Sequence, residues 1–313
     1  MTDPGALLRI AMDAAGEAGR LLASWRGHER PEVVDTKSSP TDVVTEMDRR
    51  SEALITESIR AVRPGDAVLG EEGGLVTLGG QGHPARVRWI VDPLDGTVNY
   101  LYGLLDWAVS IAAEMDGTVL AGVVAVPRRG ETFTAVAGQG AWLRQDGDPA
   151  NAISLHCTTG VPLGQALVGT GFGYAQGRRR VQGEVVAALL PHVRDIRRGG
   201  SAAVDLCSVA AGRLDAFFER GLNYWDYAAG GLIASEAGAR VGGLSGRPES
   251  TSMAVAAGPD LYPQLDEFLA GLNPERDEPL ARGNRDCLRA EFRRGACALG
   301  ANVTEFPAGI GHN

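Results

Sequence analysis

The sequence predicts an α/β protein in which sheets and helices are layered within one continuous body. Apolar residues recur at helical spacing over residues 5–26, and short apolar runs separated by glycine turns follow over residues 107–144. The second half alternates strand-like and helix-like segments up to residue 272, and no linker rich in proline or serine divides the chain. These patterns favour an α/β fold of layered sheets and helices.

The first quarter of the chain predicts two helices with a polar loop between them. Residues 5–26 place alanine and leucine at helical spacing, which predicts an amphipathic helix. Residues 31–40 are polar and predict a loop. Thr45 is a suitable N-cap for a second helix that runs to about Val62, and Pro64 with the glycine after it ends that helix.

The middle of the chain predicts an antiparallel meander, and the second half predicts alternating strands and helices. Between residues 109 and 143, apolar runs are separated by glycine turns, which are typical of β-hairpins. The second half predicts strands at residues 166–169 and 214–218. It predicts helices at residues 178–190, 202–211, 225–237 and 261–272.

Two aspartates that follow a short apolar run are the most informative feature of the sequence. Residues 87–91 predict a buried strand, and Asp92 and Asp95 come after it. Two carboxylates this close repel each other unless a positive charge lies between them, and a divalent metal is the simplest such charge. Aspartate, proline and glycine are also common in solvated turns, so these residues alone leave a turn and a metal site as equal alternatives.

Residues 92–100, DPLDGTVNY, resemble the signature of the inositol monophosphatase family, the magnesium-dependent phosphatases related to fructose-1,6-bisphosphatase. Four further segments match the family in the same order, namely residues 37–48, residues 70–73, residues 200–203, and Glu219 with Trp225 and Asp226. The resemblance extends over residues 5–272, and residues 169–174 are most similar to bacterial inositol-1-monophosphatases. It implies an αβαβα sandwich and magnesium-dependent hydrolysis of a small phosphate monoester, with inositol 1-phosphate as the favoured substrate.

The resemblance also implies which residues bind magnesium. Glu71, Asp92 and the backbone carbonyl of Leu94 would bind the first ion, and Asp92, Asp95 and Asp226 would bind the second. A third, weaker ion near Glu71 is implied as well, and so is inhibition by lithium. Oxygen ligands suit magnesium, and the histidines and cysteines show no spacing typical of a metal site.

Thr97 and Asp48 match the family residues that activate the attacking water. A hydroxyl can relay a proton from the water to a carboxylate, so the assignment is chemically reasonable. The backbone N–H groups of Gly96 and Thr97, at the start of an expected helix, would bind the phosphate. Both side chains could instead cap helices, because Asp48 lies three residues after Thr45, close to a capping box.

Ser201, Ala202 and Glu219 match positions that contact the polyol part of the substrate. A carboxylate accepts charge-assisted hydrogen bonds from hydroxyl groups, so Glu219 is a candidate for selectivity, with an ordinary surface acid as the alternative. Lys37 belongs to a loop near the weaker ion and could equally be a solvated charge. The alternative substrates are histidinol phosphate, fructose-1,6-bisphosphate and a 3′,5′-nucleotide, and a further alternative is a non-catalytic interaction role for a dimeric scaffold.

Composition limits the partners of the chain. The 313 residues carry a formal net charge of −9, which argues against nucleic acid as the main ligand and leaves a small phosphorylated metabolite. No N-terminal segment resembles a signal peptide, and no apolar run is long enough to predict a membrane span. The four cysteines are scattered, which is typical of reduced thiols, so we expect a cytoplasmic protein.

The chain is expected to form one catalytic body over residues 1–273, with two closely packed halves that meet near residue 150. Residues 274–313 are rich in charged residues and glycine and extend past the family's usual end, so we expect an extension that is dispensable for turnover. The family is commonly dimeric, and the resemblance therefore implies a homodimer.

Overall fold

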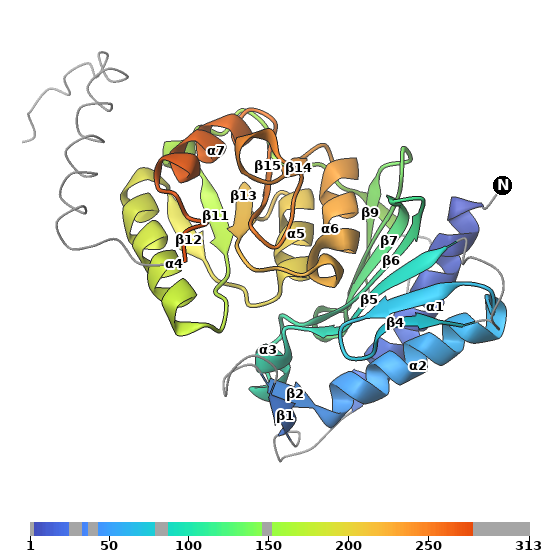
Figure 1. Cartoon of the computed structure of the whole chain (residues 1–313). Helices are drawn as coiled ribbons and strands as arrows, with labels where there is room; N and C mark the ends of the chain where they lie inside the picture. The colour runs from blue at the N-terminus through green and yellow to red at the C-terminus, as the bar shows by residue number, and fades with distance from the viewer. Residues whose placement is uncertain (1–2, 25–32, 37–42, 79–86, 146–151, 278–313) are drawn as a thin grey trace, which may run out of the picture.

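The computed structural model describes residues 3–24, 33–36, 43–78, 87–145 and 152–277, which form seven α-helices and three sheets (Figure 1). The helices are α1 (Pro4–Ser24), α2 (Glu46–Val62), α3 (Thr97–Leu101), α4 (Gln176–Leu189), α5 (Ala202–Ala210), α6 (Tyr224–Glu236) and α7 (Tyr262–Gly271). The strands of the two larger sheets are β3 (Ala67–Gly70), β4 (Gly74–Thr77), β5 (Arg88–Asp95), β6 (Ala108–Met115), β7 (Thr118–Val126), β8 (Glu131–Val136), β9 (Ala141–Gln145), β10 (Ala152–Ser154), β11 (Leu167–Thr170), β12 (Asp195–Arg197), β13 (Ala216–Glu219), β14 (Arg240–Gly242) and β15 (Ala254–Ala257).

The segment between the first two helices differs from the expected polar loop. It contains β1 (Val33–Thr36), which pairs antiparallel with β2 (Val43–Thr45). The predicted cap of the second helix is confirmed, because Thr45 and Asp48 form a capping box at the start of α2. No helix of the described residues is long and apolar enough to cross a membrane.

The larger sheet has eight strands in the order β10-β9-β8-β7-β6-β5-β3-β4, and the predicted meander is confirmed as its antiparallel run from β6 to β9. Its strand β5 pairs parallel with β3 and antiparallel with β6. This strand runs on through both aspartates, where a turn after residue 91 was expected. Against β6, Asp92 faces Ser110 and Asp95 faces Ala108, so β5 carries one extra residue and bulges between its two acids.

The smaller sheet has five strands in the order β12-β11-β13-β15-β14. Strand β11 pairs parallel with both β12 and β13, and β15 pairs antiparallel with β13 and β14. Parallel strands end at the same edge of a sheet, so the loops that follow β11 and β13 lie next to each other. That shared edge forms one wall of the site described below.

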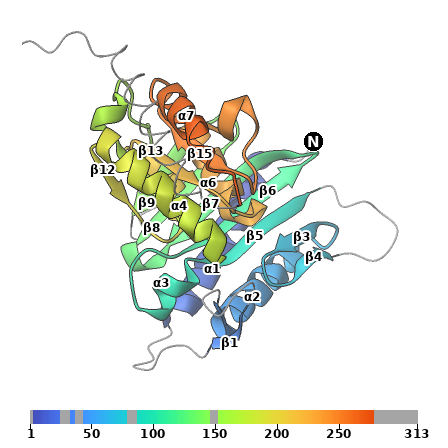
Figure 2. The same ribbon diagram turned by 60° about the vertical axis from the view of Figure 1, so that its left-hand side comes forward.

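Five layers make up the body, which confirms the αβαβα sandwich (Figures 1 and 2). Helices α1 and α2 cover one face of the larger sheet, α5 and α6 lie between the two sheets, and α4 and α7 cover the outer face of the smaller sheet. Trp89 and Val91 of β5 pack toward α1 and α2, whereas Ile90 packs toward the central helices. Because side chains alternate along a strand, Asp92 follows Ile90 and faces α6.

Candidate active site

A pocket of about 480 Å³ lies where the C-terminal ends of β5, β11 and β13 approach the N-terminal ends of α3, α5 and α6. Helix N-termini carry partial positive charge and free N–H groups, which favours an anionic ligand at this place. The predicted site residues that line the pocket are Glu71, Asp92, Leu94, Asp95, Gly96, Thr97, Ala202, Glu219 and Asp226. Asp48 and Ser201 lie behind this lining, in contact with Thr97 and Asp95, and Lys37 falls outside the described residues.

Asp92 and Asp226 line the pocket from the two halves of the molecule. Asp92 is buried and accepts a hydrogen bond from the Leu94 N–H at 3.1 Å. Burial first, and then the charges of Glu71 and Asp95, raise the pKa of Asp92 well above its ordinary value. Burial and the charge of Glu71 likewise raise the pKa of Asp226. The Asp226 side chain also caps α6, since it accepts the Asn223 N–H at 2.6 Å.

Asp95 is held by the start of α5. Its Oδ2 accepts a hydrogen bond from the Ser201 hydroxyl at 2.6 Å and one from the Ala203 N–H at 2.7 Å. Burial raises the pKa of Asp95, and these hydrogen bonds oppose that shift because they stabilise the carboxylate. Ser201 also caps α5 by accepting the Val204 N–H. The Ser201 hydroxyl therefore positions Asp95, one of the proposed metal ligands.

Gly96 lets three segments meet at the floor of the pocket. Its φ of 89° lies in the left-handed region, and a Cβ at this position would be 3.0 Å from the Asp106 carbonyl oxygen. The buried Asn99 fixes the same junction, because its amide donates to the carbonyls of both Asp106 and Gly199. Asn99 was not predicted from the sequence, because its partners are backbone atoms that no sequence pattern marks.

Thr97 contacts the buried Asp48, and the capping alternative for Asp48 is confirmed. One carboxylate oxygen caps α2 by accepting the Thr45 N–H at 2.8 Å, and the other lies 2.9 Å from the Thr97 hydroxyl. The Thr97 hydroxyl also lies 3.2 Å from the Leu94 carbonyl, so its single proton has two possible acceptors. Burial raises the pKa of Asp48 above its ordinary value, and hydrogen bonds from Thr45 oppose the shift.

Helix α2 positions both acid-bearing segments of the larger sheet. Besides Asp48, it presents Ser51, whose hydroxyl donates to the Pro93 carbonyl at 2.8 Å. Glu52 accepts the N–H groups of Glu72 and Gly73 at 2.8 and 2.7 Å, and so holds the turn that carries Glu71. These residues were missed, although polar side chains at positions i, i+3 and i+4 on the inward face of a helix could have indicated them.

Glu219 lies at the far side of the pocket, at the end of β13. It packs directly against the Cα of Gly171, where a Cβ would overlap its carboxylate. Burial, and then the charges of Asp205 and Asp95, raise the pKa of Glu219 to about 8, while Arg198 acts in the opposite direction. Burial also raises the pKa of Asp205 to about 8. Asp205, on α5, was not among the predicted residues.

Three arginines that were not predicted from the sequence, Arg178, Arg198 and Arg220, also line the pocket. Arg178 and Arg198 belong to runs of arginines, RRR at residues 178–180 and RR at residues 197–198, which resemble ordinary surface charge. Arg178 lies against Gly173 and Gly221, on the loops that follow β11 and β13. These cations lie close to the acidic residues and give the pocket the mixed charge that a phosphorylated ligand with metal ions would require.

Comparison with known proteins identifies the family. The model of the inositol monophosphatase family matches residues 3–278. This chain belongs to the inositol monophosphatase family. It is 43% identical to the inositol-1-monophosphatase SuhB of Mycobacterium tuberculosis over 281 residues, which cover 86% of this chain and 94% of the relative. It is 38% identical to the Nus factor SuhB of Escherichia coli over 280 residues, which cover 88% and 99%.

The fold of this inositol monophosphatase family member also matches solved structures. The structure of Mycobacterium tuberculosis SuhB superposes with a TM-score of 0.73 at 40% identity, covering 88% of this chain and all of that one. The IMPase of Thermotoga maritima gives a TM-score of 0.73 at 29% identity, over 85% and 98% of the two chains. The expected family and sandwich fold are therefore both confirmed.

The donor set of this family member fits a hard divalent cation. Its acidic side chains offer only oxygen, and burial and mutual repulsion raise the pKa of Asp92 and Asp226, which a cation would reverse. Among the described residues, no group of three or more His, Cys, Asp or Glu side chains is arranged closely enough to hold a metal ion by itself. Magnesium keeps several waters in its coordination shell, so the protein need supply only some of its ligands.

Proposed function

We propose that this chain is a magnesium-dependent phosphatase that hydrolyses a small phosphate monoester, with inositol 1-phosphate as the preferred substrate. Membership of the inositol monophosphatase family supports phosphatase activity. The observation that carries the proposal is the convergence of five acidic side chains on one pocket, beside the contact between Thr97 and the buried Asp48. Hard oxygen donors next to a proton acceptor are what metal-assisted hydrolysis of a phosphate ester requires.

Two or three magnesium ions are proposed for this pocket. Glu71, Asp92 and the Leu94 carbonyl would hold one ion. Asp92, Asp95 and Asp226 would hold a second, and a third, weaker ion would lie near Glu71. When bound, the ions supply positive charge that polarises the phosphoryl group and makes water a better nucleophile. The proposed lithium sensitivity belongs to the same acidic set and is tested by inhibition of turnover.

Thr97 and Asp48 are proposed to remove the proton from the attacking water. When the Thr97 hydroxyl donates to Asp48, its oxygen is free to accept a hydrogen bond from a water in the pocket. Asp48 is fully buried, and its raised pKa makes it a better proton acceptor than an exposed carboxylate. The proton then passes from water to Thr97 while the hydroxyl proton moves to Asp48.

The phosphate is proposed to bind at the start of α3. The backbone N–H groups of Gly96 and Thr97 are the first ones of this turn and belong to the pocket lining. Arg178 and Arg198 supply positive charge on the other walls, where they can neutralise the phosphate oxygens. Lys37 is proposed as a further charge near the weakest ion.

The alcohol part of the substrate is proposed to lie against Glu219 and Ala202. A carboxyl group at Glu219 can hydrogen-bond vicinal hydroxyl groups, and its ionised form, which the bound cations would favour, would repel a second phosphate. This favours a neutral polyol over fructose-1,6-bisphosphate or a 3′,5′-nucleotide. Histidinol phosphate is the alternative, because its ammonium group would be attracted to the same carboxylate. Ser201 is proposed to affect substrate binding indirectly, because its hydroxyl holds Asp95.

The test compares kcat/KM for inositol 1-phosphate, histidinol phosphate, fructose-1,6-bisphosphate and a 3′,5′-nucleotide in the wild type and in Glu219→Gln. We expect inositol 1-phosphate to be preferred, and the preference to fall by roughly tenfold in the variant, about 1.4 kcal/mol in transition-state binding. A wild-type preference of tenfold or more for histidinol phosphate would replace inositol 1-phosphate by the alternative.

An interaction role is a second candidate, because the Escherichia coli relative is named a Nus factor. Such a role would use the outer surface of the fold and would not require turnover. Expression of the inactive Asp92→Asn chain in cells that lack the protein separates the two functions. If the Asp92→Asn chain restores growth, the interaction role is established. If only the wild-type chain restores growth, catalysis is favoured.

A homodimer in the cytoplasm is proposed as the working form. Three exposed apolar side chains, Tyr102, Leu104 and Leu105, lie on the segment that follows α3 and would be covered in an assembly. Light scattering of the full chain measures the mass directly. A monomer at micromolar concentration would contradict the proposed assembly.

A further inference from the structure

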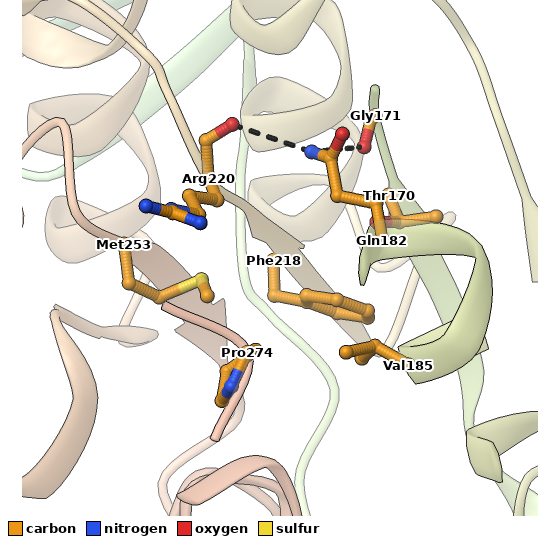
Figure 3. A pocket seen from close by; sticks show the side chains of 8 residues that line it. All are labelled: Thr170, Gly171, Gln182, Val185, Phe218, Arg220, Met253 and Pro274. Carbon is orange, nitrogen blue, oxygen red and sulfur yellow. Dashed lines mark hydrogen bonds between the residues drawn. The ribbon is translucent and has the colours of Figure 1, made fainter. Parts of the chain in front are cut away.

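The substrate side of the pocket is built from two neighbouring loops that one buried glutamine ties together. The Gln182 amide nitrogen of α4 lies 3.3 Å from the Gly171 carbonyl and 3.4 Å from the Arg220 carbonyl (Figure 3). Its amide oxygen accepts the Gly173 N–H at 3.0 Å. Gln182 therefore fixes the spacing between the loop after β11 and the loop after β13, which begins next to Glu219.

The end of the described chain is attached to the loop after β13 and to α4. The Arg220 side chain donates to the Asp277 carboxylate at 2.6 Å and to the Arg276 carbonyl. The Arg276 side chain in turn donates to Glu184 of α4 at 2.6 Å. Residues 274–277, which we call the C-terminal strap, therefore bind both α4 and the loop that carries Arg220.

The strap is closely packed against the smaller sheet. Pro274 lies with Phe218, Met253 and the stem of Arg220 around a cavity of only about 10 Å³ (Figure 3). The side chains of Arg220 and Arg276 are 10% and 11% exposed. A charged group this buried is costly unless its hydrogen bonds are made, so the Arg220 side chain strongly favours the docked strap.

We propose that the C-terminal strap, through Arg220 and Gln182, holds Glu219 at the position where it binds the alcohol part of the substrate. This inference rests on the proposed function of Glu219. Arg220 adjoins Glu219 in the chain, and its carbonyl and side chain are fixed from opposite sides, by Gln182 and by the strap. Arg220 is thus a positioning residue for selectivity. The boundary expected after residue 273, between the catalytic body and the extension, lies just before the strap that contacts Arg220.

The experiment uses the full-length chain with Arg220→Met, which keeps the length of the side chain and removes its donors. Arg60→Met is the matched control, because Arg60 forms an exposed ion pair with Glu57 on α2. The first readout is the ratio of kcat/KM for inositol 1-phosphate to that for phenyl phosphate, whose leaving group carries no further hydroxyl groups. The second readout is hydrogen exchange in peptides that cover residues 171–175 and 219–223.

We expect Arg220→Met to lower the ratio by about tenfold, mainly through KM for inositol 1-phosphate, because one charge-assisted contact is misplaced. Exchange in the two peptides should become faster, and Arg60→Met should change neither readout. An unchanged ratio, or an equal loss for both substrates, would overturn the role in selectivity. Unchanged exchange would overturn the strap itself.

Asp277→Ala keeps the test decisive if Arg220→Met does not fold, because Asp277 is exposed and its removal leaves the core intact. We expect the same direction with a smaller change, about threefold. A wild type without any preference for inositol 1-phosphate would overturn the proposed function of Glu219, whereas the exchange measurement would still decide whether the strap holds the two loops.

Discussion

The two halves of the molecule contribute different parts of the pocket and hold them by different means. The larger sheet contributes Glu71, Asp92, Asp95 and Thr97 from one strand, one turn and one short helix. Side chains of α2 contact Thr97 and the backbone next to Glu71 and Asp92, and Ser201 at the N-cap of α5 holds Asp95. The smaller sheet contributes loops whose positions depend on Gln182 and on arginine contacts.

If the proposed function is right, this difference separates the chemistry of the site from its selectivity. Residues fixed by a continuous strand and a buried helix face have few alternative positions, whereas loops at a sheet edge can change more easily. A defect in the first half should therefore affect every substrate equally, and a defect in the second should change their ranking. The second half also supplies exceptions, namely Asp226 on α6, a proposed metal ligand, and Arg178 and Arg198, which are proposed to neutralise the phosphate.

The largest effect is expected at Asp92, the ligand that both proposed ions share. Asp92→Asn removes a negative charge from the centre of the acidic set, so turnover should be almost completely lost for inositol 1-phosphate and phenyl phosphate alike. Thermal unfolding and circular dichroism check that the fold persists. Substantial turnover by this variant, or by the wild type in EDTA, would contradict the metal-dependent mechanism.

Thr97→Ala comes next and tests the proton pathway. We expect kcat to fall by roughly two to four orders of magnitude, the range for proton-transfer assistance, with a smaller change in KM. Thr97→Ser keeps the hydroxyl and is the matched control, which should retain most of the activity. A change confined to KM would show that the Thr97–Asp48 pair binds the substrate or supports the fold without moving the proton.

Glu52→Gln tests whether α2 positions the turn that carries Glu71. Its amide can accept only one of the two N–H groups, so the magnesium concentration for half-maximal binding should rise by roughly 10- to 100-fold. Calorimetric titration measures the binding without turnover. Glu57→Gln, on the exposed face of the same helix, is the control and should bind magnesium as the wild type does. Equal affinities in the two variants would remove Glu52 from the site.

The smallest effect is a pH dependence of stability that arises in the second half. In the folded protein without metal, burial raises the pKa of Asp205 from 3.8 to about 8. The native state then binds a proton that the unfolded chain releases, so this group lowers stability increasingly as the pH rises from 4 toward 8.

Asp205→Asn removes that ionisation. The variant should therefore be more stable relative to the wild type at about pH 8 than at about pH 5. The gain in unfolding free energy between the two pH values should be on the order of 1–3 kcal/mol, and the melting temperature of the variant should rise accordingly. Thermal scans in EDTA at the two pH values measure it. A difference that is the same at both values would show that Asp205 does not titrate in this range.

The acids of β5 were accessible from sequence because they are close in the chain, and any fold that ends a strand there brings them together. Glu71 and Asp226 are distant in sequence and were identified only through the resemblance to the family. Ser51, Glu52 and Asn99 were missed for a physical reason, since each acts on backbone groups of a remote segment. Backbone N–H and carbonyl groups occur at nearly every residue, so the sequence does not indicate which of them will need a partner.

The same limit explains the partial success with the fold. The helices and the meander follow from periodicity and glycine turns, and both are confirmed. Strand β5 was expected to stop before its acids, because Pro93 and two aspartates are typical of turns. In the protein this segment continues as a bulged strand, in which β6 pairs with both aspartates and the Ser51 hydroxyl donates to the Pro93 carbonyl.

The contact between Gly171 and Glu219 couples the evolution of the two positions. The Glu219 carboxylate fills the volume that any side chain at position 171 would need. Relatives that carry a larger residue at position 171 should carry a shorter one at the position of Glu219. If position 171 is enlarged before Glu219 is shortened, the intermediate with both large residues should be inactive. Libraries designed to alter selectivity would therefore sample the two positions as a pair, starting with Glu219.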